Sequence, residues 1–445
     1  MREGFIDSDL YTRLVDSYRS KLNEGKVTVD ILDKSVVKDQ YKVCDWAPYC
    51  ATQETKYNYK AISEKTLKEL AMKMGTVPEG IKVQMQVKKA LTDREKMAVG
   101  ELPLNWGFAE TLAYATLLEE GYPVRLSGED SGRGTFSHRH AVVKNMDTSS
   151  NVDEYIPLQH INKEARFDVI DSTLSEYGVL GFEYGYSCYS PDSLVIWEAQ
   201  FGDFVNTAQV VIDQFLVAAE EKWGILSGLT LLLPHGQEGA GSEHSSARLE
   251  RFLSSCANQN MQVCTPTTPA QIYHLLRRQV IRPLRKPLIV MTPKSLLRNP
   301  KAVSSLEELS KGHFERVIDD SEAKAVKVTK LVLCNGKVYY DLMAKKLDKY
   351  DNIAVVRIEE LYPTPREDMA KVLAKYKKAK QIVWLQEEPQ NKGAWYHIRG
   401  KLEKLLDAKQ SLECVARERS STPAVGYHAL YMKQQEELVN RVLDI

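Results

Sequence analysis

From about residue 101 onwards, short apolar runs alternate with segments in which apolar residues repeat at helical spacing. Five of these runs have the length of buried strands; they lie at residues 123–126, 194–197, 229–233, 261–264 and 287–291. Strands that alternate with helices predict a mostly parallel sheet covered by helices on both faces. The pattern therefore predicts an α/β fold.

Helix signals separate several of these strands. Apolar residues recur at helical spacing from Phe204 to Ala219. Thr268, Pro269 and Gln271 form a capping box with proline at the first helical position, which predicts a helix through residues 272–278. A further helix is expected over residues 245–255, after a glycine-rich loop.

A charged stretch at residues 310–327 interrupts the pattern, and a second α/β unit follows it. Its strands are expected at residues 330–334, 353–358 and 381–385, and Thr364 is expected to cap the helix between the last two. A terminal helix is expected over residues 430–442. The first 90 or so residues show helical patterns at 10–22 and 64–74 but no alternation of strand and helix, so we expect an extension that wraps around the rest.

Composition narrows the class of protein. The chain has 445 residues with 60 basic and 60 acidic side chains, and this neutral balance argues against a nucleic-acid binder. The longest apolar stretch, at residues 225–233, is too short to span a bilayer, and the acidic start lacks the apolar core of a signal peptide. Seven cysteines without a CxxC pair fit a reducing compartment, either a cytosol or an organelle matrix.

The glycine-rich loop after the strand at 229–233 is the first candidate site. His235 and His244 bracket three glycines there, at the carboxyl end of a strand, where open α/β sheets bind ligands. The loop lacks the Lys-Ser/Thr of a P-loop, so it does not indicate a nucleotide site. A plain connecting loop is the alternative, although a turn does not need two imidazoles.

Two carboxylates, Glu110 and Glu176, lie in apolar surroundings. An unpaired buried carboxylate has a raised pKa, which suits a group that must hold or share a proton. Either residue would also be ordinary on the exposed face of a helix, and the residues alone do not rank the two.

Three further groups carry weaker signals. His138 and His140 share a face if their segment is extended, but no third ligand lies nearby, so no metal site is expected. Asp130 and Arg133 either serve a site or pair to order their own loop. A pair of phenylalanines three residues apart, Phe201 and Phe204, would clamp a flat ring, although spacing alone favours core packing.

The longer motifs resemble one family. SGEDSGRGTFSHRHAV, LSEYGVLGFEYGY, WEAQFGDF, LLPHGQEGAGSEHSSARLERF, CTPTTPAQIYHLLRRQ and QEEPQNKGAW are similar to the decarboxylating component of 2-oxoglutarate dehydrogenase, which depends on thiamine diphosphate. The resemblance runs from about residue 46 to the C-terminus. It implies a transketolase-like fold, with a pyrimidine-binding domain at residues 92–293, a linker at 294–326, a C-terminal domain at 327–445 and the extension at 1–91.

The same resemblance implies roles for individual residues. Glu176, in the LSE motif, is the family's catalytic glutamate and faces N1′ of the aminopyrimidine, whereas Glu110 is not. Phe201 and Phe204 match the aromatic pocket for the pyrimidine, and His244 matches a histidine that contacts the substrate. His235, Asp130 and Arg133 are expected to support the substrate site, and the chain itself is expected to supply no metal ligand.

One motif of the family has no counterpart here. We find no Gly-Asp-Gly, the segment that holds the magnesium ion bridging the diphosphate. The chain therefore resembles the C-terminal half of a protein about twice as long, and alone it is expected to be inactive. It would pair with itself or with an N-terminal half, act on a small 2-oxo acid, and pass the succinyl group to the lipoyl-bearing succinyltransferase core of the tricarboxylic acid cycle complex.

Three alternatives remain beside this interpretation. A 2-oxoadipate dehydrogenase differs from the 2-oxoglutarate branch in few pocket residues. A non-catalytic dimerisation half would keep the fold alone, although Glu176, Phe201, Phe204 and His244 are all intact. A transketolase-like carbohydrate enzyme fits WEAQFGDF and QEEPQNKGAW less well.

Overall fold

The structure is a computed structural model that describes residues 8–26, 46–50, 60–147, 149–346 and 350–444. The chain divides into two units, residues 1–45 and residues 46–445. The first unit holds helix α1 (Ser8–Asn23), which confirms the helix expected at residues 10–22. None of the helices described is long and apolar enough to cross a membrane. Six cysteines lie in the described part, and none of them forms a disulfide.

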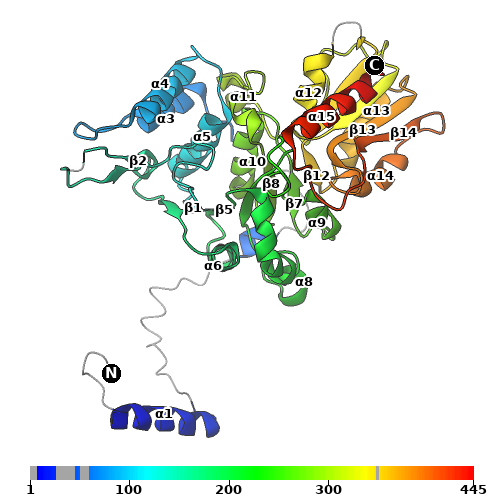
Figure 1. The fold of residues 1–445 in the computed structure, drawn as a ribbon. Helices are drawn as coiled ribbons and strands as arrows, with labels where there is room; N and C mark the ends of the chain where they lie inside the picture. Colours follow the sequence, from blue (N-terminus) through cyan, green and yellow to red (C-terminus); the bar gives the residue numbers. More distant parts are fainter. Residues whose placement is uncertain (1–7, 27–45, 51–59, 148, 347–349, 445) are drawn as a thin grey trace. The chain divides into compact units, whose positions relative to one another are not determined.

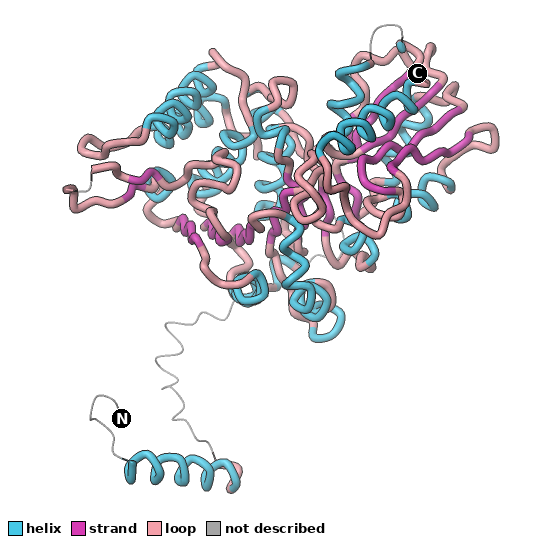
Figure 2. Tube along the Cα trace, viewed as in Figure 1, coloured by secondary structure: helices cyan, strands magenta, loops and turns pink. Residues whose placement is uncertain are grey.

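A seven-stranded sheet forms the centre of the second unit (Figures 1 and 2). Its order is β12-β7-β8-β6-β5-β1-β4, and all neighbouring strands are parallel except the antiparallel pair of β12 and β7. The strands are β1 (Val124–Gly128), β4 (Phe167–Asp171), β5 (Leu194–Glu198), β6 (Thr230–Pro234), β7 (Gln262–Cys264), β8 (Leu288–Thr292) and β12 (Glu360–Tyr362). The five predicted strands are confirmed, and so is the mostly parallel sheet.

Alternate residues of the central strands enter two different apolar cores. Along β5, Leu194 and Ile196 pack into one core, and Val195 and Trp197 pack into the other. Strands β6 and β8 alternate in the same way. Both faces of the sheet are therefore covered, which is why the strands read as continuous apolar runs rather than alternating ones.

Helices α5 (Trp106–Glu119) and α10 (Pro269–Ile281) contribute to one core, and α6 (Glu176–Tyr189) and α9 (Leu249–Ser254) contribute to the other. The α10 helix begins where predicted, because the Thr268 hydroxyl accepts the Gln271 N–H. Helix α9 is shorter than expected. The Ser246 N–H donates to Asp203 and Arg248 has a φ of 56°, so the helix starts only at residue 249.

The helix expected from Phe204 to Ala219 is broken into four pieces. They are a 3₁₀ helix η3 (Gly202–Ala208), α7 (Gln209–Val211), a π-helical turn η4 (Ile212–Leu216) and α8 (Ala219–Trp223). Ala208, Val211, Ile212 and Ala219 are buried as the spacing predicts. Phe215 is 39% exposed, so the apolar stripe is not wholly a core face.

Helices α3 (Glu64–Gly75) and α4 (Met85–Val99) stand beside α5 (Figure 1). Leu67, Leu70 and Met74 of α3 are buried in the core that α5 and α10 share. The helix expected at residues 64–74 is confirmed. Within the expected extension, the segment from residue 62 onwards thus packs into the first domain. A short hairpin of β2 (Val143–Lys144) and β3 (Glu154–Tyr155), and the 3₁₀ turns η1 (Ala47–Tyr49) and η2 (Pro157–His160), complete this part.

Residues 294–326, the expected linker, hold the 3₁₀ turn η5 (Ser295–Arg298), α11 (Leu306–Lys311) and β9 (Val317–Ile318). A second sheet follows in the order β14-β13-β10-β11-β9, with β9 antiparallel and the rest parallel. Its other strands are β10 (Lys330–Cys334), β11 (Ile353–Ile358), β13 (Gln381–Pro389) and β14 (Ser411–Arg417). Strand β12, directly after β11, joins the first sheet, so the two halves of the unit are interlocked.

Helices α12 (Val338–Lys345), α13 (Arg366–Lys375), α14 (Trp395–Glu403) and α15 (His428–Leu443) accompany the second sheet. The terminal helix is confirmed by α15. The cap expected from Thr364 is wrong, because Pro365 occupies the N-cap position and the Thr364 hydroxyl donates to the Leu361 carbonyl.

Candidate functional site

The residues singled out in the sequence follow three parallel strands of the first sheet. Glu176 comes after β4, Phe201 and Phe204 come after β5, and the glycine-rich loop comes after β6. Because β4, β5 and β6 run parallel, their carboxyl ends meet at one edge of the sheet. The topology therefore brings all three segments to the same side of the first domain.

Glu176 occupies the first turn of α6 and is partly exposed. The preceding Ser175 starts the helix, since its hydroxyl accepts the Gly178 N–H at 3.4 Å. The Thr207 hydroxyl donates to Glu176 Oε2 at 2.8 Å and, within the described residues, is the only hydrogen-bond partner of this carboxylate. A helix N-terminus favours negative charge, and the Thr207 hydroxyl fixes the direction of the carboxylate. Glu176 is therefore an oriented hydrogen-bond acceptor rather than a core residue.

Phe201, Phe204 and His244 form a cluster of rings beside this carboxylate. The His244 ring centroid lies 4.5 Å from that of Phe201 and 5.8 Å from that of Phe204, and both contacts are edge-to-face. The two phenylalanines meet at 5.9 Å and 72°, so they do not form a parallel clamp. All three rings are partly exposed, whereas spacing alone favoured core packing for the phenylalanines.

Thr207 connects the carboxylate to the ring cluster. Its hydroxyl, which is bonded to Glu176, lies 3.0 Å from the Phe204 carbonyl. Glu176, Thr207, Phe204 and His244 are thus consecutive members of one contact chain. His244 does not point into the core.

Backbone contacts define the loop that carries His244. The buried Lys294 ammonium donates to the carbonyls of Gly236 at 3.0 Å and His244 at 2.5 Å. Asp203, between the two phenylalanines, accepts the Ser246 N–H at 3.0 Å. Lys294 was not predicted as part of the site, because an apolar strand followed by a lysine gives no signal that the ammonium turns inward.

A buried ion cluster includes Glu198, the last residue of β5, three residues before Phe201. Arg139 is fully buried, and its guanidinium donates to both oxygens of Glu198 at 2.6 and 2.7 Å and to Glu110 Oε1 at 2.7 Å. Arg94 donates to the carbonyls of His138 and Arg139, and Trp106 and Tyr114 donate to Glu110. The structure thus makes Glu110 a paired core carboxylate, rather than an exposed helix residue.

The electrostatics of this cluster follow from its pairing. Burial raises the pKa of Glu110, but the charge and hydrogen bond of Arg139, with His138 and the Tyr114 hydroxyl, together outweigh burial and lower the pKa, contrary to the rise expected for an unpaired buried carboxyl. Burial raises the pKa of Glu198 in spite of Arg139. Burial, followed by the charge of Arg139, lowers the pKa of His138 to about 3, so this imidazole is neutral at physiological pH.

The segment of His138 and His140 is not extended, so the expectation that they share a face is wrong. Ser137 and His140 have positive φ values of 52° and 45°, so the backbone turns at both residues instead of running straight through His138. Within the described residues, no group of three potential metal ligands occurs. Asp130 and Arg133 form an exposed ion pair at 2.8 Å, as the simpler of their two interpretations predicts.

His235 lies at the base of the loop rather than in the ring cluster. Its side chain is 6% exposed, and its Nε2 lies 2.7 Å from Glu388 Oε1 of the second sheet. Burial lowers the pKa of His235, but the hydrogen bond and charge of Glu388 raise it above its ordinary value.

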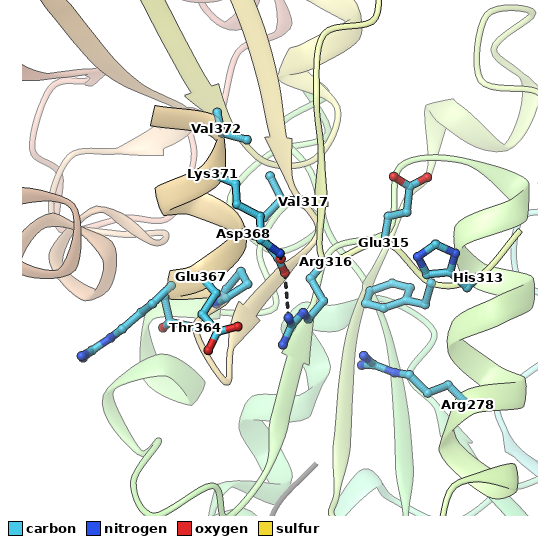
Figure 3. Close-up of a pocket in the computed structure, with 13 residues that line it drawn as sticks. Arg278, His313, Glu315, Arg316, Val317, Thr364, Glu367, Asp368, Lys371 and Val372 are labelled. Atoms are coloured by element: carbon cyan, nitrogen blue, oxygen red, sulfur yellow. Dashed lines mark hydrogen bonds and ion pairs between the residues drawn. The ribbon is translucent and has the colours of Figure 1, made fainter. Parts of the chain in front are cut away.

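A cavity of about 1080 Å³ lies elsewhere in the second unit, and its lining includes Arg278, Arg316 and Asp368 (Figure 3). Arg316 and Asp368 form an ion pair across it at 2.7 Å. None of the ring-cluster residues lines this cavity, so it does not belong to the candidate site.

Comparisons with known proteins match both halves of the second unit. Residues 103–300 match the transketolase pyrimidine-binding domain, and residues 303–443 match the 2-oxoglutarate dehydrogenase C-terminal domain. The chain is 52% identical to the 2-oxoglutarate dehydrogenase E1 component of Azotobacter vinelandii over 99% of its own length and 47% of that protein. The corresponding values are 51%, 97% and 46% for Coxiella burnetii, and 44%, 100% and 48% for Rickettsia conorii. The chain therefore spans about half the length of the curated relatives it matches.

Proposed function

The chain corresponds to the C-terminal half of the 2-oxoglutarate dehydrogenase E1 family, and from this we propose that it supplies the pyrimidine-binding half of a thiamine-diphosphate site that decarboxylates 2-oxoglutarate. The observation that carries the proposal is the chain of contacts from the Glu176 carboxylate through Thr207 to Phe204 and His244. It unites a proton-holding group, aromatic rings and an imidazole at the carboxyl edge of one sheet.

The residues present fit an aminopyrimidine. Glu176 is partly exposed and has one oxygen held by Thr207, which leaves the carboxylate oriented toward a further hydrogen-bond partner. Phe201 and Phe204 expose ring surface beside it and belong to neither apolar core. A flat, polar-edged ring requires these two kinds of contact.

Each residue then has a defined task. When bound, thiamine diphosphate supplies an electron-accepting thiazolium for the decarboxylation of a 2-oxo acid. Glu176 would hold a proton against the pyrimidine nitrogen, and Thr207 fixes the direction of its carboxylate. Phe201 and Phe204 would support the pyrimidine, and His244 would donate a hydrogen bond to the substrate or to its developing negative charge. Magnesium and the diphosphate would be held by residues outside this chain.

Replacing His244 with alanine in the full-length enzyme is expected to slow decarboxylation of 2-oxoglutarate about 100- to 1000-fold, as for the loss of one oxyanion donor. Affinity for thiamine diphosphate should stay nearly unchanged, because Glu176, Phe201 and Phe204 are intact. Stopped assays for carbon dioxide release, with cofactor titration of the same variant, measure both. The control is His160→Ala, because His160 is exposed and precedes β4, whereas the candidate site follows the carboxyl ends of the strands. Equal losses in the two variants would remove His244 from the site.

We also propose that this half pairs with a second copy or with an N-terminal half, and that the assembled enzyme serves a lipoyl-bearing succinyltransferase core. The relatives described above are bacterial, which favours the cytoplasm over a mitochondrial matrix. Large side chains are exposed on α6 and on the irregular helical segment after it; they are Tyr177, Phe182, Tyr186, Tyr189, Val210, Phe215 and Trp223. Large apolar patches on a protein surface typically mark interaction sites, so we propose these side chains as part of the contact.

The isolated chain is therefore expected to self-associate at micromolar concentration. Phe182 is 58% exposed, and Phe182→Glu should shift the population toward monomer because it places a charge in the contact. Tyr396→Glu, at a similarly exposed position of α14, should not. Sedimentation velocity measures the difference. A strict monomer in the unmodified chain would contradict the pairing.

A further inference from the structure

His235 ties both ends of the His244 loop to the second sheet. Its backbone N–H donates to the carbonyl of Thr292 on β8 of the first sheet at 2.9 Å, and its ring Nδ1 accepts the Ala247 N–H at 3.1 Å. Because Nδ1 accepts an N–H, the proton of the neutral ring is on Nε2, which donates it to Glu388 at 2.7 Å. A single buried imidazole thus spans the start of the loop, its end and strand β13.

Three further close approaches join this loop to the C-terminal part of the chain: to β13, to residue 423 and to α15. The Gln237 N–H donates to Glu387 Oε1 at 2.7 Å, and the Gln237 side chain donates to the Pro423 carbonyl at 2.9 Å. Gly239 has a φ of 72°, and a Cβ there would lie 2.3 Å from Nδ1 of His428, the first residue of α15. The loop is therefore seated on β13, on residue 423 and on α15.

The end of the loop also determines where His244 lies. Ala247, held by His235, is three residues after His244, and the intervening Ser246 is bonded to Asp203. Asp203 stands between Phe201 and Phe204, the rings that His244 contacts. A shift of Ala247 would consequently move the His244 ring relative to these two rings.

From these contacts we propose that Glu388, in the C-terminal domain, is a positioning residue for His244. It selects the Nε2–H form of His235, which leaves Nδ1 to accept the Ala247 N–H, and this holds the His244 ring against Phe201 and Phe204. The second sheet then takes part in shaping the candidate site. The positioning is a property of this chain, and only its effect on turnover rests on the proposed function.

Histidine-selective ¹⁵N labelling of the 445-residue chain tests the positioning, since the chain has only nine imidazoles. His235→Asn and His244→Asn variants assign the two resonances. In the unmodified chain His235 is expected as the single Nε2–H tautomer. Glu388→Met should mix its tautomers and shift the His244 ring resonance, because ring-current effects from Phe201 and Phe204 change with distance. Glu388→Gln should preserve both signals, because its amide oxygen still accepts the Nε2 proton.

The control is Glu413→Met, an exposed carboxylate on the neighbouring strand β14, which should move neither signal. If Glu388→Met does not fold, Glu388→Asp replaces it, since one missing methylene lengthens the bond to His235 and should also shift His244. An Nδ1–H form of His235 in the unmodified chain, or an unmoved His244 resonance in the folded Met or Asp variant, would overturn the proposal.

In the full-length enzyme, Glu388→Met is expected to lower kcat by up to about 100-fold, as for small displacements of a positioned group, with little change in cofactor affinity. Glu388→Gln should restore most of the loss. A shifted His244 resonance with unchanged turnover would support the positioning and contradict the role proposed for His244. An unmoved resonance would contradict the positioning itself, so the two failures are distinguishable.

Discussion

Glu176→Gln is expected to lower turnover of the full-length enzyme about 100- to 10,000-fold, the range found when an acid–base group is lost. Glutamine keeps the shape of the side chain, and its amide oxygen can still accept the Thr207 hydroxyl. It cannot exchange a proton with a pyrimidine nitrogen. The loss should therefore appear in kcat, while folding and the ring cluster remain as they are.

The second carboxylate of the sequence provides the comparison. Glu110 is bonded to Arg139, Trp106 and Tyr114 in the core, and both of its oxygens accept hydrogen bonds there. Glu110→Gln should reduce stability, but turnover of the folded fraction much less than Glu176→Gln does. Steady-state rates normalised to bound cofactor separate the two effects. Equal loss of normalised turnover in both variants would leave the choice of Glu176 unsupported.

Arg139→Met is expected to lower the free energy of unfolding by about 3–5 kcal/mol, because it leaves two carboxylates, Glu110 and Glu198, buried without a cation. Methionine fills much of the arginine volume, so the loss reports the missing charge rather than a cavity. Urea denaturation of the isolated chain, followed by tryptophan fluorescence, measures it.

Arg133→Met is the matched control, six residues away. Arg133 is about half exposed and pairs with the equally accessible Asp130, and such surface pairs contribute about 0–1 kcal/mol. The two variants remove the same side chain from the same loop region. If both variants lowered the free energy of unfolding equally little, the buried ion cluster would not be an important source of stability.

Five strands of the first sheet and three of the second could be predicted from sequence, because burial on both faces leaves an apolar run with polar residues on either side. The expected strands did not include β4, β9, β12 or β14, whose segments are short or contain polar residues. The runs at residues 330–334 and 353–358 coincide with β10 and β11. Helix boundaries were less predictable where tertiary contacts compete for backbone groups. Residues 245–248 bond to Asp203, Gly241 and His235 instead of starting α9, and no local propensity encodes those partners.

The candidate site was predictable where one motif carries a role and not where a role depends on partners far apart in sequence. Glu176 was singled out from its motif, and its catalytic role stays a prediction. Arg139, between the two histidines that attracted notice, was missed because its partners Glu110 and Glu198 lie 29 and 59 residues away. Glu388 lies 153 residues from His235, so only the packing of the second sheet against the first reveals their contact.

The most direct test of the pyrimidine-binding role is calorimetric titration of thiamine diphosphate with magnesium. In the proposed site, stacking and a few hydrogen bonds would hold the pyrimidine, but the diphosphate would need the charge of a metal that this chain is not expected to hold. The isolated chain should bind the cofactor weakly or not at all. The same chain joined to an N-terminal half, either in one polypeptide or as a reconstituted complex, should bind it tightly. Glu176→Gln in that complete enzyme should bind it more weakly. Tight, magnesium-dependent binding to the isolated chain would contradict this division of the cofactor site.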